Sequence, residues 1–243
     1  MTAQTLAAPA DQAAFTERSL LLEKFLNPMP EFRLNESHTE EATPVRDCVR
    51  ERYQAAYHAE VRHFLPWLLS MQCLGQVSGV AGLQPAGSAP LYLEQYMSAP
   101  VETLLGNLSG STVARSKIVE VGNLVAARRG ASHLLFLMFT QVLHTAGYEW
   151  MVFTATHALR NNLTKLGFEL QEVQAIDTTA LSPRLLEEWG SYYSTEPVVM
   201  AGRLSSAANL VQSRTLYRRI ARLYRPFIRQ LAARLQQGEH HAA

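Results

Sequence analysis

The stretch KIVEVGNLVA at residues 117–126, followed by ARRGA at residues 127–131, predicts a strand, a glycine turn and the start of a helix. Its first part is an apolar run typical of a buried strand, and a helical run opens directly after Gly130. The first turn of a helix has backbone N–H groups without partners in the helix, and a glycine beside it lets a phosphate approach the main chain closely. Arg128 and Arg129 would add positive charge. An ordinary strand–helix turn with two solvated arginines fits the same residues equally well.

A second strand and helix follow at once. YEWMVFTA at residues 148–155 predicts the strand, and the next helix runs from about His157 to Leu166, where Gly167 ends it. Thr156 stands where it can cap this helix. Strand, helix, strand and helix joined by short loops predict two parallel neighbouring strands.

Longer strings in this region resemble known families. The segment LTKLGF at residues 163–168 resembles the end of the corresponding helix in GNAT-type N-acyltransferases. Taken together, IVEVGNL, RRGA, FTATHALRNNLTKLGFEL and EEWGSYYSTEPVVMAG resemble the thermostable hemolysin family, which is similar in turn to acyl-homoserine-lactone synthases. The resemblance covers roughly residues 30–203. It implies a GNAT-like α/β (α+β) fold, with a mixed, mostly antiparallel sheet whose parallel central strand pair is splayed and flanked by helices.

The resemblance also implies an acyl donor, either acyl-CoA or the acyl-phosphopantetheine of an acyl carrier protein. In GNAT folds the glycine loop binds the pyrophosphate of coenzyme A, and residues beside the splayed strands hold the pantetheine amides. By this resemblance, the donor-binding residues are expected to be Val121, Asn123, Val125, Arg128, Arg129, Gly130, Ala131, Ser132, Thr154, Thr156, Asn161 and Asn162. The loop keeps only the central glycine of the family spelling, and Leu163 stands where a tyrosine commonly acts as general acid.

Glu120 is the candidate catalytic residue. Strict alternation along a strand puts Glu120, Gly122 and Leu124 on one side and Val119, Val121 and Asn123 on the other. A carboxylate among apolar neighbours is costly to bury unless it has a partner or a chemical role, and burial raises its proton affinity. Glu120 could therefore take the proton of an attacking amine. The competing interpretation is an ion pair with an arginine such as Arg115 or Arg160. Acyl-homoserine-lactone synthases carry a Glu-x-Ser-Arg-like string here, whereas this chain reads Glu-Val-Gly-Asn.

Aromatic residues near two loops suggest a substrate pocket. The first group surrounds Glu94 in the stretch LYLEQY, and the second is EWGSYY at residues 188–193. Glu94, Tyr96, Trp189 and Tyr192 are the pocket candidates. The alternative is that these side chains only tether loops and anchor the last strand.

The flanking segments supply the remaining elements of the expected fold. EFRLNES predicts a first strand, Thr43-Pro44 opens a helix, and WLLSMQCL with QVSGVAGLQPA predicts an antiparallel hairpin around Gly75. ELQEVQAI and PVVMAGRL predict the last two strands. We expect residues 1–29 to be a mobile leader with a short helix, residues 30–204 to be the GNAT-like domain, and residues 205–243 to be a basic amphipathic helix and tail.

The C-terminal segment combines apolar residues at helical spacing with seven arginines. From Pro197 to Gly238 it contains no acidic residue. Such a helix could pack on its own domain, lie on an anionic membrane or bind an acidic acyl carrier protein.

Composition narrows the classes of function. The chain has 243 residues, 47% of them hydrophobic, with a formal net charge of +1, which does not favour nucleic-acid binding. Cys48 and Cys73 lack the spacing of a disulfide framework, which favours a reduced, cytoplasmic setting. The basic C-terminal segment would also allow a peripheral position at a membrane. His157 has no second ligand at metal-binding spacing, so no metal site is expected.

Three functions remain open at this point. The first is an N-acyltransferase that moves an acyl group from a thioester to the amine of a small molecule such as an amino acid or a related metabolite. The second is a membrane-active, hemolytic protein without turnover. The third is a catalytically inactive acyl-binding module, which the altered glycine loop and the missing tyrosine would fit.

Overall fold

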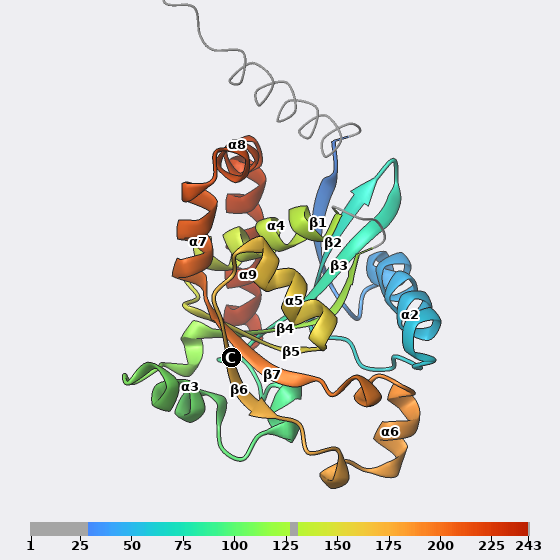
Figure 1. Ribbon diagram of the computed structural model, residues 1–243. Coiled ribbons are helices and arrows are strands. Elements are labelled where there is room, and N and C mark those ends of the chain that lie inside the picture. The colour runs from blue at the N-terminus through green and yellow to red at the C-terminus, as the bar shows by residue number, and fades with distance from the viewer. Residues whose placement is uncertain (1–28, 127–130, 243) are drawn as a thin grey trace, which may run out of the picture.

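A seven-stranded sheet forms the centre of the computed structural model, which describes residues 29–126 and 131–242 (Figure 1). The strand order is β1-β2-β3-β4-β5-β7-β6. Every neighbouring pair is antiparallel except β4 and β5, which are parallel. The predicted fold class, a mostly antiparallel sheet with one parallel central pair, is confirmed.

The N-terminal part has the expected strand, helix and hairpin. These elements are β1 (Glu31–Glu36), α2 (Thr43–Tyr57), β2 (Trp67–Cys73) and β3 (Gln76–Pro85), with the short 3-10 turn η1 (Glu40–Ala42) before α2. Pro44 lies in the first turn of α2, where its missing N–H costs no hydrogen bond. The helix predicted near residues 16–25 lies outside the described residues.

The strand–helix–strand–helix unit is also present. It comprises β4 (Ile118–Ala126), α4 (Ala131–Thr145), β5 (Trp150–Ala155) and α5 (His157–Leu166). Before it lie η2 (Tyr92–Tyr96), α3 (Val101–Ser109) and η3 (Arg115–Lys117). After it come β6 (Leu170–Ala175), η4 (Thr178–Ala180), α6 (Pro183–Trp189), η5 (Tyr193–Thr195) and β7 (Val198–Arg203). The Thr156 hydroxyl caps α5 by accepting the Leu159 N–H at 3.3 Å, as predicted.

A bulge in β4 changes the predicted alternation of side chains. Gly82 of β3 faces Gly122, whereas Val80 faces Val125, so β4 contains one extra residue between these pairs. Asn123 adopts the left-handed conformation there, with φ 46°. Leu124 therefore packs on the same core as Val119 and Val121, instead of lying on the side of Glu120 as strict alternation predicted.

Beyond this point β4 and β5 diverge. Their paired positions are Ile118 with Trp150, Val119 with Met151 and Glu120 with Val152. No pair follows, although β4 continues to Ala126 and β5 to Ala155. The two strands thus separate on the C-terminal side of Glu120.

Helices cover both faces of the sheet (Figure 1). The larger core lies between the sheet and α4, α7 and α9, with Leu163 and Leu166 of α5 at its border. On the opposite face, one apolar cluster joins η2, α3, β6 and α6, and a second one joins α2 to β2 and β3. The opening between β4 and β5 therefore lies between the apolar layers on the two faces of the sheet.

The C-terminal segment is helical and amphipathic, as expected, but it consists of three helices: α7 (Leu204–Ser213), α8 (Thr215–Leu223) and α9 (Arg225–Ala242). Arg214 is extended between α7 and α8, and Pro226 cannot continue α8 because it lacks an N–H and would clash with the preceding turn. The apolar faces of all three helices join the main core. Of the three roles considered for this segment, packing on its own domain is thus observed.

Candidate active site

A cavity of about 890 Å³ extends through the opening between β4 and β5. It is lined by residues from both faces of the sheet. On one face, which we call the helix side, the lining is apolar and comes from α4, α5 and β5: Phe136, Phe139, Met151, Phe153, Leu163 and Leu166. On the other face, which we call the aromatic side, the lining is Tyr53, Tyr57, His63, Tyr92, Tyr96, Trp189 and Tyr192.

Glu120 lies where the strands begin to separate, and its side chain lines the cavity. The residue is only 4% exposed. Burial raises the pKa of Glu120 to about 8, partly offset by the backbone N–H groups of Leu93 and Tyr92. The Leu93 N–H donates to Glu120 Oε2 at 3.3 Å. At neutral pH a buried carboxyl with this pKa is close to its titration midpoint, which suits proton transfer.

The ion pair considered for Glu120 is not formed. Arg115 instead binds Glu94 at 2.7 Å and Glu102 at 2.8 Å, and Arg160 binds Glu172 at 3.2 Å. Both arginines therefore pair with other carboxylates, and the interpretation that Glu120 forms an ion pair with Arg115 or Arg160 is wrong.

The aromatic side is assembled from four separate segments. Tyr53 and Tyr57 come from α2, Tyr92 and Tyr96 from η2, and Trp189 and Tyr192 from α6 and the residues after it, while His63 comes from the loop between α2 and β2. We call the six tyrosine and tryptophan rings the aromatic cluster.

Two backbone contacts fix the ends of α2 and α6 against each other. The Ser191 N–H donates to the Tyr57 carbonyl at 2.8 Å, and the Glu60 N–H donates to the Glu188 carbonyl at 2.7 Å. A Cβ added at Gly190 would lie 2.3 Å from the Tyr57 carbonyl oxygen. Glycine is thus required at this close approach.

Many of the predicted donor-binding residues meet at the cavity. Val121, Asn123, Val125, Ser132, Thr154, Thr156 and Asn162 line it. Ser132 lies in the first turn of α4, and Thr156 caps the first turn of α5. The cavity therefore reaches the start of two helices, where backbone N–H groups and the helix dipoles favour an anion.

Not every described residue of the predicted set lines the cavity, and Asn123, which does, also has a structural role. Asn161 is exposed and is not part of the cavity lining. The Asn123 side chain accepts the Leu65 N–H at 2.8 Å and donates to the His63 carbonyl at 3.1 Å, so its amide holds a loop. Arg128, Arg129 and Gly130 lie outside the described residues, and Ala131 is the first residue of α4.

Of the four predicted pocket residues, Tyr96, Trp189 and Tyr192 line the cavity and Glu94 does not. Glu94 is held by Arg115 and by the backbone N–H groups of Leu91 and Val101, which lowers the pKa of Glu94 to about 2. It tethers a loop, which was the alternative considered for this stretch.

Sequence reasoning missed the contribution of α2. Tyr53 and Tyr57 are spaced four residues apart and so lie on one face of the helix. That spacing was the available signal, but nothing in the local sequence shows which element the tyrosines would meet.

Among the described residues, no group of three or more His, Cys, Asp or Glu side chains could hold a metal ion. In the same residues, no helix combines the length and the apolar character needed to cross a bilayer.

Solved structures with the same fold include several synthases. The acyl-homoserine-lactone synthase LasI is 10% identical, has a TM-score of 0.51, and the match covers 72% of this chain and 90% of LasI. FeeM, an N-acyl amino acid synthase from uncultured soil microbes, is 14% identical with a TM-score of 0.50, covering 74% of this chain and 98% of FeeM. BjaI, a CoA-dependent acyl-homoserine-lactone synthase solved with SAM and isopentyl-CoA, is 10% identical with a TM-score of 0.50. The match covers 76% of this chain and 89% of BjaI. At these identities the likeness shows a shared fold.

Sequence comparison identifies the family. A search of curated protein sequences found no match. The family model described as thermostable hemolysin matches residues 35–208, which is more than half of the chain. The chain therefore belongs to the thermostable hemolysin family.

Proposed function

We propose that this protein is an N-acyltransferase, which moves an acyl group from a thioester to the amine of a small molecule. The single observation that carries the proposal is the cavity that passes between β4 and β5 and has Glu120 at the point where they separate. One side of that cavity suits an acyl chain and the other suits a second substrate. The shared fold with LasI and FeeM, which are synthases of N-acylated products by their names, supports this reading.

The donor is an acyl-CoA or an acyl-phosphopantetheine on a carrier protein. Its pantetheine arm would lie between the diverging strands, beside Thr154, Thr156 and Asn162. Its phosphates would lie near the first turns of α4 and α5. The acyl chain would contact the apolar helix side, where Phe136, Phe139 and Leu163 are buried.

Glu120 is the proposed general base. In the reaction, the amine nitrogen attacks the thioester carbonyl carbon and gives a tetrahedral intermediate. The intermediate collapses as the C–S bond breaks and the C–N bond is retained. The ammonium form of the amine gives one proton to the Glu120 carboxylate before the attack, and the departing thiolate takes a second proton from the same nitrogen and leaves as the free thiol. Atoms and charge balance without a metal or a redox cofactor.

The proposal is tested by incubating the purified chain with medium- and long-chain acyl-CoAs and a panel of amines. Free thiol is measured by colorimetry and N-acyl product by mass spectrometry. We expect thiol and product in equal amounts, and kcat/KM that rises about tenfold per pH unit below pH 8 and then levels off. Glu120→Gln should reduce kcat at least 100-fold and remove that rise. Transfer that survives in Glu120→Gln would contradict the base assignment, and thiol release without any N-acyl product would contradict the transferase.

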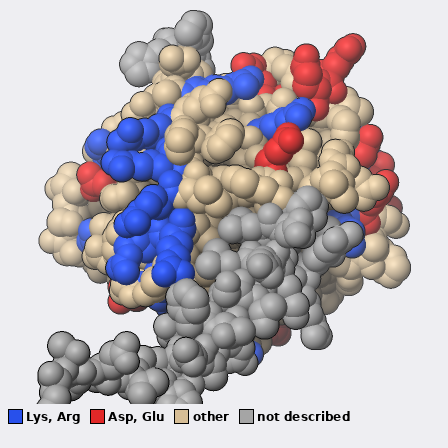
Figure 2. Space-filling model, turned by 90° about the horizontal axis from the view of Figure 1, so that it is seen from above, with Lys and Arg blue, Asp and Glu red and all other residues tan. Residues whose placement is uncertain are grey.

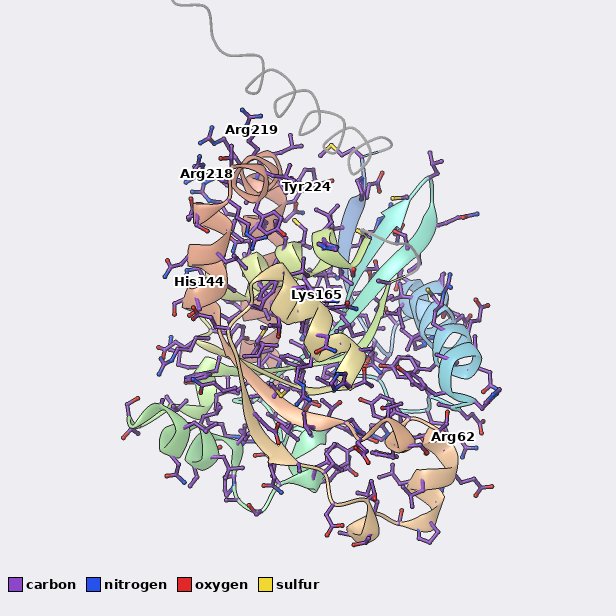
Figure 3. All side chains as sticks on the ribbon, in the orientation of Figure 1. Arg62, His144, Lys165, Arg218, Arg219 and Tyr224 are labelled. Atoms are coloured by element: carbon purple, nitrogen blue, oxygen red, sulfur yellow. The ribbon has the colours of Figure 1, made fainter. Side chains whose placement is uncertain are left out.

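A second candidate function, binding to an anionic membrane surface, is favoured by the outer face of α8 and the start of α9. Figure 2 shows a continuous band of Lys and Arg atoms on this end of the molecule, and in Figure 3 Arg218 and Arg219 point away from the body. Leu223 and Phe227 are each 47% exposed beside these arginines. Basic residues with neighbouring exposed apolar side chains are typical of helices that bind at lipid interfaces.

Vesicle sedimentation separates this candidate from the first. We expect binding to vesicles that contain phosphatidylglycerol and little binding to pure phosphatidylcholine. The combined change Arg218→Gln, Arg219→Gln and Arg222→Gln should weaken binding at least tenfold, since each arginine near such a surface contributes about 1 kcal/mol. Arg184→Gln removes one exposed charge on α6, away from this face (Figure 1), and is the control for Arg218→Gln alone. Equal binding by the triple variant would rule out this face.

A further inference from the structure

Four of the six polar tips of the aromatic cluster, those of Tyr92, Tyr96, Trp189 and Tyr192, are hydrogen-bonded within the protein. Trp189 Nε1 donates to Tyr92 Oη at 3.2 Å, and Tyr192 Oη donates to Thr154 Oγ1 at 3.1 Å. The hydroxyl groups of Tyr96 and Tyr193 are 2.6 Å apart. Because these groups are already engaged, a ligand on the aromatic side meets mainly ring faces.

The rings also form one connected group, which fixes the positions of those faces. Ring centroids are 5.2 Å apart for Trp189 and Tyr192, 5.3 Å for Tyr57 and Tyr192, and 5.8 Å for Tyr53 and Trp189. Tyr92 lies 6.4 Å from Trp189. The close approach at Gly190 and the two backbone contacts between the ends of α2 and α6 hold this arrangement before a ligand binds.

On the aromatic side, the buried ionisable group in the described lining is acidic and none is a cation. Among the described residues that line the cavity, Glu120 is the buried acidic group. Burial raises the pKa of Glu120 to about 8, so its carboxylate form becomes populated as pH approaches 8, and it accepts a hydrogen bond from the same η2 segment that carries Tyr92. The two cationic residues of that lining, Arg52 and Lys165, have exposed side chains; Lys165 comes from α5 (Figure 3). A ligand at the aromatic cluster thus meets one carboxyl and several ring faces, with no buried cation in the described lining.

These surroundings discriminate between kinds of amine. An ammonium group is attracted to ring faces and to a carboxylate. A ligand carboxylate at the same place would lose its hydration next to Glu120 without a buried cation to pair with, which is costly. An aromatic or aliphatic body attached to the amine would bury its apolar surface against the rings.

We propose that the acceptor is a primary amine that carries no carboxylate, of the arylalkylamine class, and that the aromatic cluster with Glu120 is its binding site. This inference rests on the proposed acyl transfer. The acceptor arrives as an ammonium ion and gives one proton to the Glu120 carboxylate. The neutral amine then attacks the thioester and loses its second proton to the leaving thiolate. The net products are the amide, the free thiol and one proton.

The test uses matched pairs of ligands that differ only in the carboxylate: phenethylamine with phenylalanine, tyramine with tyrosine, and tryptamine with tryptophan. Binding to the full chain is measured by isothermal titration calorimetry without any acyl donor. We expect each amine to bind at least tenfold more tightly than its amino acid. Equal or tighter binding of the amino acids, or no binding of any amine, would overturn the proposal.

Two variants distinguish a specific site from general apolar binding. Trp189→Phe keeps a ring face and should bind phenethylamine within about twofold of the wild type, whereas Trp189→Leu keeps apolar bulk without the ring face and should bind it about threefold to tenfold more weakly. Glu120→Gln should bring the affinities of phenethylamine and phenylalanine closer together. If Trp189→Leu binds phenethylamine as tightly as the wild type, the ring faces do not select the ammonium group.

The same ligand pairs separate failure of this inference from failure of the proposed function. Selective binding of the amines with no acylated product from any thioester would mean that the transferase proposal is wrong and the binding site is right. If phenylalanine or tyrosine is acylated in preference to phenethylamine or tyramine, the transferase proposal is right and the proposed acceptor class is wrong.

Discussion

Asn123 has a structural role that its local sequence did not suggest. By the family resemblance it was predicted to contact the donor, and it does line the cavity. The strand, however, bulges at Asn123, and the side-chain amide bridges to His63 and Leu65 across the cavity wall. The local sequence contains no signal for a partner about sixty residues away, because that contact depends on how the chain folds back.

Glu120 is the residue whose predicted burial is confirmed, and its protonation should be visible in the stability of the protein. Its pKa is about 8 in the folded state, against an ordinary value of 4.5. Between these values the folded state keeps a proton that the unfolded state has lost. The free energy of unfolding should therefore fall as pH rises from about 4.5 to 8, by roughly 1.4 kcal/mol per pH unit at most.

Glu120→Gln should remove this pH dependence, since glutamine has no proton to lose. We expect the variant to gain stability over the wild type as pH rises, reaching a few kcal/mol by pH 8, measured by urea denaturation across pH 5–9. Glu94→Gln is a control of opposite sign, measured between pH 2 and 5: the pKa of Glu94 is lowered to about 2, so its stabilising contribution is fully present above pH 4.5 and is lost as pH falls toward 2. A constant difference between Glu120→Gln and wild type across pH 5–9 would show that Glu120 is not protonated in the fold.

At the scale of elements, the contact between the ends of α2 and α6 determines whether the aromatic side forms at all. Gly190 has φ 52° and leaves no room for a Cβ next to the Tyr57 carbonyl. Gly190→Ala must therefore push α6 away from α2.

We expect Gly190→Ala to lower stability by about 1–3 kcal/mol and to lower affinity for phenethylamine at least tenfold, because Trp189 and Tyr192 move with the loop. Thermal unfolding and calorimetry measure the two effects. Gly75→Ala is the control. Gly75 also has a positive φ, but its added Cβ would meet nothing within 4 Å, so this variant should be less stable than the wild type and should bind phenethylamine with unchanged affinity. An unchanged amine affinity in Gly190→Ala would show that the cluster does not depend on this contact.

The elements themselves could be predicted well where their signals are local. Each of these signals lies within a few residues of the element that it predicts. Apolar runs predict the strands, Gly75 predicts the hairpin turn and Thr156 predicts the start of α5. The division of the C-terminal segment into α7, α8 and α9 was less clear, because its apolar spacing continues across Pro226. Burial of Ile228, Leu231 and Leu235 in the main core also means that deleting residues 205–243 would expose the core. Substitution of its exposed arginines is therefore the better test of that segment.

For the whole molecule, the order of elements and the family resemblance were enough to predict the sheet and its parallel central pair. The shape of the cavity was not predictable, since it is built from α2, η2, α4, α5 and α6, which are brought together only by the fold. Tyr53 and Tyr57 on α2 illustrate this, because their face of the helix reads like any apolar face until α6 is placed against it. The sequence therefore identified Glu120 as a buried carboxylate and some of the residues around it, but not the other walls of the cavity.

The most direct test of the whole account is a crystal structure of the chain with a non-reactive thioether analogue of an acyl-pantetheine. This ligand contains the part that acyl-CoA and a carrier-protein donor share. We expect the pantetheine arm to lie between residues 121–126 and 153–156, the sulfur to lie near Glu120 and the alkyl chain to contact Phe136 and Leu163. An analogue bound elsewhere, with the space between β4 and β5 left empty, would contradict the account.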